Sequence, residues 1–234
     1  EILIGLVGSE MCIRDRYKCP CWKYRLSTSI WIIIVHSGAI FNQNRRKASR
    51  FSAATWEPEA HTMKQYKVGI IGGTGMVGQR FITLMEHHPW FQLTAIAASA
   101  RSAGKPYAEA VAGRWALDVP MPEEAKNLVV LDAEQDAERL ASMVDFCFCA
   151  VDMKKEEIRA LEEKYARLEC PIVSNNSAHR WTDDVPMVVP EINADHLAVI
   201  EAQRKRLGTR RGFIAVKSNC SLQSYVPALH PLKK

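Results

Sequence analysis

Three glycines at three-residue spacing follow an apolar run, and they constrain the fold more than any other feature of this sequence. Gly72, Gly75 and Gly78 form a G-x-x-G-x-x-G pattern after the strand-like residues 68–71, and residues 79–86 continue as a helix. Glycine supplies the backbone angles of a tight turn, and its missing Cβ lets a phosphate approach the N–H groups at the positive end of a helix. This order favours a dinucleotide-binding turn. Gly-rich turns also occur as plain connections between a strand and a helix, so the glycines need supporting evidence.

Strand-like and helical segments alternate along the rest of the chain. Apolar runs predict strands at residues 91–98, 127–131, 144–151, 171–174 and 212–217. Helices are expected at residues 134–143, at 153–168, in a segment that ends at 206, and from 222 onward. Residues 105–124 are less regular and are interpreted as a connection and lid. The alternation predicts an α/β fold with a doubly wound parallel sheet of the Rossmann type, whose ligand lies at the carboxyl ends of the strands.

The helix expected at residues 153–168 has one apolar face. Ile158, Leu161, Tyr165 and Leu168 recur at spacings of 3, 4 and 3 residues. We interpret the charged face of this helix as a solvated surface rather than a binding site.

The distribution of charge argues against a nucleic-acid partner. The chain has 31 Lys and Arg and 26 Asp and Glu, a formal net charge of +5. Residues 1–62 contain 9 of the basic and 5 of the acidic residues, so residues 63–234 contain 22 basic and 21 acidic residues. The part with strand and helix patterns is therefore nearly neutral, and its charge gives no reason to expect nucleic acid.

Residues 1–62 do not share the pattern of the remainder. The apolar segment at residues 30–35 is too short to span a bilayer, so no membrane partner is expected. We interpret residues 1–62 as a non-native or disordered extension, with Met63 as the natural start. An organelle-targeting leader is the alternative, which the acidic residues among the basic ones disfavour.

The seven cysteines show no metal-binding spacing beyond Cys19-Pro-Cys21, and no metal site is assigned. Cys147 and Cys149 alternate in a predicted buried strand, which indicates core thiols in a reducing compartment. We therefore expect a cytoplasmic enzyme.

The residues that follow the second predicted strand indicate which dinucleotide is bound. An acidic residue about 20 positions after the glycines would hold a free ribose 2′-hydroxyl. This chain instead has Ser99, Arg101 and Ser102 there. Hydroxyls and a guanidinium suit a 2′-phosphate, which favours NADP over NAD. A solvated loop with an ordinary surface arginine is the alternative.

Two later strands also end in polar residues. Asn175, Asn176, Ser177 and Arg180 follow one strand and suit a nicotinamide ribose or an anionic substrate, although Asn and Ser also cap helices. Cys220 lies between the last strand and a helix, where the first N–H groups of the helix favour a thiolate nucleophile. A buried apolar role is the alternative for a single cysteine.

Five sequence blocks in order resemble aspartate-semialdehyde dehydrogenase, nearer its archaeal and fungal branch than its common bacterial one. The blocks cover residues 72–78, 99–105, 174–180, 189–193 and 218–221. The resemblance extends from about Met63 to the end of the chain. Gly73 is a departure, since alanine is usual there, and we expect it to be tolerated.

The resemblance implies a role for each candidate site residue. Cys220 forms the acyl thioester, while Asn219 and Arg180 lie near the substrate or inorganic phosphate. The expected NADP-binding residues are Gly72, Thr74, Gly75, Met76, Val77, Gly78, Ser99, Arg101, Ser102, Asn176 and Ser177.

The reaction implied by the resemblance interconverts aspartyl 4-phosphate and aspartate 4-semialdehyde, for lysine, threonine and methionine synthesis. Residues 63–217 would form the NADP-binding domain, and residues 218–234 would begin a catalytic and dimerisation domain that is incomplete. The full-length protein is expected to be a homodimer or homotetramer, and the 234-residue chain to be inactive because the histidine base lies further on. The alternatives are N-acetyl-gamma-glutamyl-phosphate reductase, disfavoured because that family usually has glycine where Asn219 stands, and a non-catalytic NADP-binding regulator.

Overall fold

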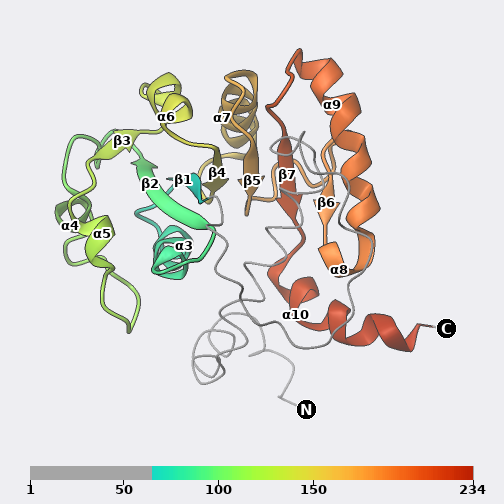
Figure 1. The fold of residues 1–234 in the computed structure, drawn as a ribbon, viewed down its shortest axis with the longest axis horizontal. Coiled ribbons are helices and arrows are strands. Elements are labelled where there is room, and N and C mark those ends of the chain that lie inside the picture. The colour runs from blue at the N-terminus through green and yellow to red at the C-terminus, as the bar shows by residue number, and fades with distance from the viewer. Residues whose placement is uncertain (1–64, 234) are drawn as a thin grey trace.

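A single seven-stranded parallel sheet forms the centre of the computed structural model, which describes residues 65–233 (Figure 1). The strand order is β3-β2-β1-β4-β5-β7-β6, and every neighbouring pair is parallel. The strands are β1 (Tyr66–Ile71), β2 (Phe91–Ala98), β3 (Val130–Asp132), β4 (Phe146–Cys149), β5 (Ile172–Ser174), β6 (Met187–Val188) and β7 (Ile214–Lys217). The order reverses direction between β1 and β4, which is where a doubly wound sheet opens a ligand crevice.

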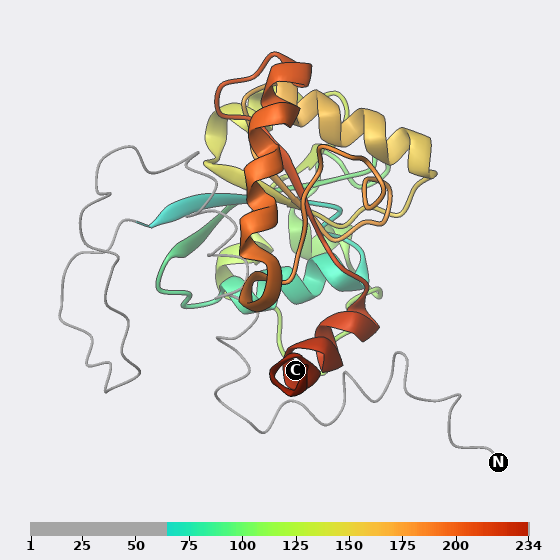
Figure 2. The same cartoon turned by 90° about the vertical axis from the view of Figure 1, so that its right-hand side faces the viewer.

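Helices cover both faces of this sheet (Figure 1). One face carries α3 (Met76–Met85), α4 (Tyr107–Ala110), α5 (Glu123–Lys126) and η2 (Ala194–Val199). The other face carries α6 (Ala137–Met143) and α7 (Lys155–Arg167). The remaining helices are α8 (Pro190–Asn193), α9 (Ile200–Leu207), α10 (Cys220–Leu229) and η3 (His230–Leu232). Figure 2 shows α10 projecting beyond the sheet after the end of β7.

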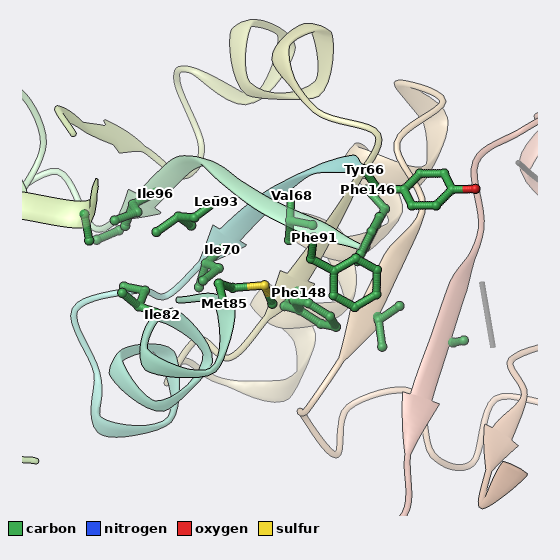
Figure 3. Packing of buried hydrophobic residues seen from close by; sticks show 14 of the residues in the cluster. Tyr66, Val68, Ile70, Ile82, Met85, Phe91, Leu93, Ile96, Phe146 and Phe148 are labelled. Atoms are coloured by element: carbon green, nitrogen blue, oxygen red, sulfur yellow. The ribbon is translucent and has the colours of Figure 1, made fainter. Parts of the chain in front are cut away.

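The strands are apolar on both faces because helices cover each side. On the first face, Ile82 and Met85 of α3 pack with Ile70 of β1, as Figure 3 shows. On the second, Leu140 of α6 and Tyr165 of α7 pack over buried strand residues. The sheet is therefore the middle layer of three, and its edge at the carboxyl ends of the strands is left for a site.

The predicted fold class is confirmed, while several predicted boundaries are wrong. The first helix begins at Met76, three residues before the predicted start, because Gly75 is extended and serves as its N-cap. The expected single helix ending at residue 206 is three segments, α8, η2 and α9. The last helix begins at Cys220 itself rather than at residue 222.

A short edge strand, β6, was not predicted. It pairs with β7 through Met187 and Val188. Residues 105–124 contain α4 and the first two residues of α5 in addition to irregular backbone.

The strands end at Lys217, and α10 and η3 follow, but a domain boundary there stays a prediction. The interpretation of residues 1–62 concerns a part of the chain outside the described residues. Within residues 65–233, no helix combines the length and the apolar character needed to cross a bilayer.

Candidate active site

The glycine loop, residues 72–78, runs from the end of β1 into the first turn of α3, and at two of its glycines a side chain would collide with backbone atoms. Gly72 has φ of +88°, and a Cβ there would lie 2.5 Å from the Ala150 carbonyl oxygen. A Cβ on Gly78 would lie 2.2 Å from the Gly72 carbonyl oxygen. Both positions therefore exclude a side chain whether or not a ligand binds.

Gly75 differs, because nothing in the protein requires glycine there. Its φ of −80° and ψ of 162° are open to any residue. A Cβ would meet only the Gly72 carbonyl oxygen, at 3.6 Å, an ordinary contact. Gly75 is exposed and caps α3 without a side-chain hydrogen bond, so the positive end of the helix has backbone N–H groups open to a ligand. This bare helix terminus fits a pyrophosphate.

Thr74, Met76 and Val77 complete the predicted phosphate cradle. Met76 is 53% exposed and Val77 43% exposed, which is high for apolar side chains in the first turn of a helix. Thr74 is half-buried. The loop therefore exposes backbone and small or apolar side chains at the carboxyl ends of the strands.

The loop after β2 contains the residues predicted to bind the adenosine end. Ser99 and Arg101 are exposed, whereas Ser102 is buried, and its N–H donates to the Ser99 carbonyl at 2.9 Å. The acidic residue that ends neighbouring β3, Asp132, accepts hydrogen bonds through Oδ1 from the N–H groups of the next turn. The carboxylate of Asp132 thus accepts hydrogen bonds from its own turn. The exposed guanidinium of Arg101 is the charged group of residues 99–102.

The loop after β5 lies over a buried polar cluster that the sequence analysis missed. Glu162 of α7 is 0% exposed, and its Oε1 accepts hydrogen bonds from Ser174 Oγ at 2.5 Å and Asn176 Nδ2 at 2.9 Å. His179 Nε2 lies 4.0 Å from Glu162 Oε2. Burial raises the pKa of Glu162, although the hydrogen bonds from Ser174 and Asn176 oppose this, and burial lowers the pKa of His179.

The cluster corrects one prediction, since the charged face of α7 is not entirely a solvated surface. Glu162 follows Ile158 by four residues and precedes Tyr165 by three, which places it on the buried stripe. This spacing in the sequence could have predicted that Glu162 is buried. Of the residues predicted at this loop, Asn176 is held by the cluster, Ser177 is exposed and Arg180 is half-buried.

Cys220 is the first residue of α10 and is exposed at the end of β7. Asn219 caps the helix, accepting a hydrogen bond at Oδ1 from the Ser221 N–H at 2.9 Å. The Cys220 Sγ lies 3.8 Å from the same oxygen. By contrast, Cys147 and Cys149 are completely buried, and burial raises the pKa of both thiols.

Arg180 and Lys217 add positive charge near this cysteine. Arg180 Nε donates to the Lys217 carbonyl at 3.2 Å, which joins the loop after β5 to the end of β7. Lys217 is half-buried, and burial lowers its pKa, while Cys220 opposes this shift. Sequence reasoning missed Lys217, whose position in a strand gave no signal.

The structure brings Arg180, Lys217, Asn219 and Cys220 to the ends of adjacent strands. The glycine loop lies at the same edge, but β4 and β5 separate β1 from β7. Three strand spacings correspond to about 14 Å. The two groups can therefore act together only through a ligand that extends along this edge of the sheet.

Both the sequence and the fold of this chain are similar to those of known proteins. Residues 67–200 match the family model described as "Semialdehyde dehydrogenase, NAD binding domain". The chain is 42% identical over 165 residues to an aspartate-semialdehyde dehydrogenase of Methanothermobacter thermautotrophicus, covering 70% of this chain and 45% of that protein. A Cryptococcus neoformans protein of the same name is 38% identical over 171 residues, covering 73% and 45%.

A solved structure is similar as well. The crystal structure of aspartate-semialdehyde dehydrogenase with NADP from Candida albicans superposes with a TM-score of 0.63 at 36% identity, covering 72% of this chain and 47% of that one. The chain thus spans about half the length of the relatives it matches.

Proposed function

The chain belongs to the semialdehyde dehydrogenase family, and from this we propose that it is the NADP-binding half of an aspartate-semialdehyde dehydrogenase. The resemblance predicted from five sequence blocks is confirmed by archaeal and fungal relatives. The observation that carries the proposal is an exposed Cys220 at the N-terminus of α10, on the same sheet edge as the glycine loop.

The residues of the glycine loop are suited to hold the pyrophosphate of NADP. Gly75 leaves space beside the uncapped end of α3, and Arg101 offers an exposed guanidinium for a 2′-phosphate. When bound, NADP accepts a hydride from the substrate carbon. We expect Arg101→Ala to weaken binding of NADP more than of NAD, and a calorimetric titration of both dinucleotides measures this.

Cys220 is the nucleophile in the proposed reaction. In the oxidative direction its thiolate adds to the aldehyde carbon, and the resulting tetrahedral oxyanion loses a hydride from that carbon to become a thioester. Inorganic phosphate then attacks the thioester carbon, which releases the thiolate and forms an acyl phosphate. Cys220 stands at the N-terminus of α10 with Lys217 nearby, and Arg180 is placed to attract an anionic substrate or phosphate.

Cysteine alkylation tests this role against that of a non-catalytic NADP-binding protein. Peptide mass spectrometry after brief iodoacetamide treatment should show Cys220 modified at least tenfold faster than Cys147 and Cys149, and aspartate semialdehyde should protect it. Cys220→Ser provides the control for peptide assignment. Equal, slow modification of all three thiols would contradict a catalytic cysteine.

Turnover is a separate question, because the chain matches about half of each relative. We expect the 234-residue chain to bind NADP without phosphate-dependent NADP reduction, measured at 340 nm. A cytoplasmic location and a homodimer or homotetramer of the full-length protein remain parts of the same proposal.

A further inference from the structure

Two buried side chains donate hydrogen bonds to carbonyl groups of the glycine loop. Neither was among the candidate site residues predicted from the sequence. Tyr107 of α4, which is 0% exposed, donates from its hydroxyl to the Gly73 carbonyl at 2.7 Å. Gln79 of α3, which is 1% exposed, donates from Nε2 to the Thr74 carbonyl at 3.1 Å. The loop therefore has two consecutive carbonyls fixed from the protein interior.

Gln79 also connects the loop to a distant segment. Its Nε2 donates to the Arg114 carbonyl at 2.9 Å, and its Oε1 accepts from the Ala116 N–H at 2.8 Å. Tyr107 is fixed in turn, since its own N–H donates to the Leu128 carbonyl at 2.8 Å. Residues 107–116 are thus a brace for the glycine loop, in the part of the chain that the sequence analysis assigned to a connection and lid.

The planarity of the peptide bond gives these contacts a consequence for binding. In a trans peptide the N–H points opposite to the C=O. Because the Gly73 carbonyl is directed at the buried Tyr107 hydroxyl, the Thr74 N–H is directed away from the interior. That is the direction from which a pyrophosphate reaches an amide of the loop.

We propose that Tyr107 is a positioning residue that orients the Thr74 amide of the glycine loop toward the pyrophosphate of the dinucleotide, and that Gln79 holds the next peptide, whose Gly75 N–H donates to the Gly72 carbonyl at 3.2 Å. This inference rests on the proposed NADP binding and deepens it. Each residue acts through the backbone, so neither needs to touch the cofactor.

The structure contains a matched control for Tyr107. Tyr165 of α7 is also 0% exposed, and its hydroxyl donates to the Ala133 carbonyl at 2.8 Å. It lies on the opposite face of the sheet, away from α3. Tyr107→Phe and Tyr165→Phe therefore each remove one buried hydroxyl from a loop carbonyl, and only the first carbonyl belongs to the glycine loop.

The experiment compares two ligands on each purified 234-residue variant. In the proposed complex NADP would contact the loop through its pyrophosphate, whereas adenosine 2′-monophosphate carries the 2′-phosphate and no pyrophosphate. We expect Tyr107→Phe to weaken NADP binding about five- to tenfold and to leave binding of adenosine 2′-monophosphate unchanged. Tyr165→Phe should leave both affinities unchanged. It should lower the melting temperature about as much as Tyr107→Phe does.

The affinity ratio of the two ligands is measured on folded protein, so a general loss of stability does not move it. Gln79→Met, which keeps the length of the side chain, should lower the same ratio and decides the matter if Tyr107→Phe does not fold. An unchanged ratio in the folded variants, or an equal change in Tyr165→Phe, would overturn the inference alone. Failure of the unchanged chain to bind NADP would overturn the proposed function and this inference with it.

Discussion

Gly75→Ala separates the two reasons for glycine in a phosphate-binding loop. At Gly72 and Gly78 a side chain would collide with backbone atoms, so glycine is needed for folding. At Gly75 the backbone angles suit any residue, and an added Cβ meets only one atom, at 3.6 Å. If the pyrophosphate approaches α3 here, glycine at position 75 serves the ligand alone.

The structure sets the expected magnitudes. Alanine at Gly75 restricts the unfolded chain, which stabilises by about 0.4–1 kcal/mol. It is also a poorer N-cap than glycine, which costs a similar amount, so the free energy of unfolding should change by less than about 1 kcal/mol. At Gly78 the new Cβ would lie 2.2 Å from the Gly72 carbonyl oxygen, and the backbone must move, at a cost of about 3 kcal/mol or more.

The affinity for NADP, unlike the stability, should fall clearly in Gly75→Ala. A methyl group on Gly75 would occupy the space beside the first N–H groups of α3. We expect at least a tenfold loss of affinity, which corresponds to about 1.4 kcal/mol. Urea denaturation gives the free energy of unfolding, and isothermal titration calorimetry gives the affinity for NADP.

Two results would refute this reasoning. Gly75→Ala that binds NADP as tightly as the unchanged chain would place the pyrophosphate elsewhere. Gly75→Ala that loses about 3 kcal/mol of stability would show that glycine at position 75 is needed for the fold. Gly78→Ala provides the comparison in the same assays.

Three further predictions concern packing and buried charge. Gly73→Ala should lower the free energy of unfolding by about 1–3 kcal/mol, because its Cβ would lie 2.4 Å from Ile96 Cγ2; in a double-mutant cycle with Ile96→Ala, additive effects would exclude this clash. Burial raises the pKa of Glu162, so its carboxylate destabilises the fold as pH rises above about 4.5. Glu162→Gln should therefore gain stability relative to the unchanged chain with rising pH, whereas Glu162→Ala should lose about 1–3 kcal/mol because Asn176 Nδ2 loses its acceptor. For Glu169, desolvation opposes ionisation, but hydrogen bonds from backbone N–H groups outweigh it and lower the pKa of the carboxyl group. Glu169→Gln should therefore be less stable than the unchanged chain above pH 4.5, and this difference should disappear as pH falls through the lowered pKa. Thermal denaturation across pH measures the difference.

The sequence predicted the fold class, and local patterns also marked the candidate site residues. The glycine loop, the alternation of strands and helices and the cysteine after the last strand all follow from local patterns. Each pattern is complete within a few residues, because backbone angles and apolar periodicity are properties of neighbours along the chain. The positions of Gly75 and Cys220 at strand ends needed no tertiary information.

Only the tertiary structure decided which side chains support the site. Tyr107 contacts Gly73 across 34 residues of sequence, and Gln79 contacts Arg114 across 35. Glu162 is buried with its Oε1 hydrogen-bonded to Ser174 and Asn176 from another strand end. Such contacts depend on the order of strands in the sheet and on how segments pack, which local sequence does not encode, since the partners of a buried polar group come from distant parts of the chain.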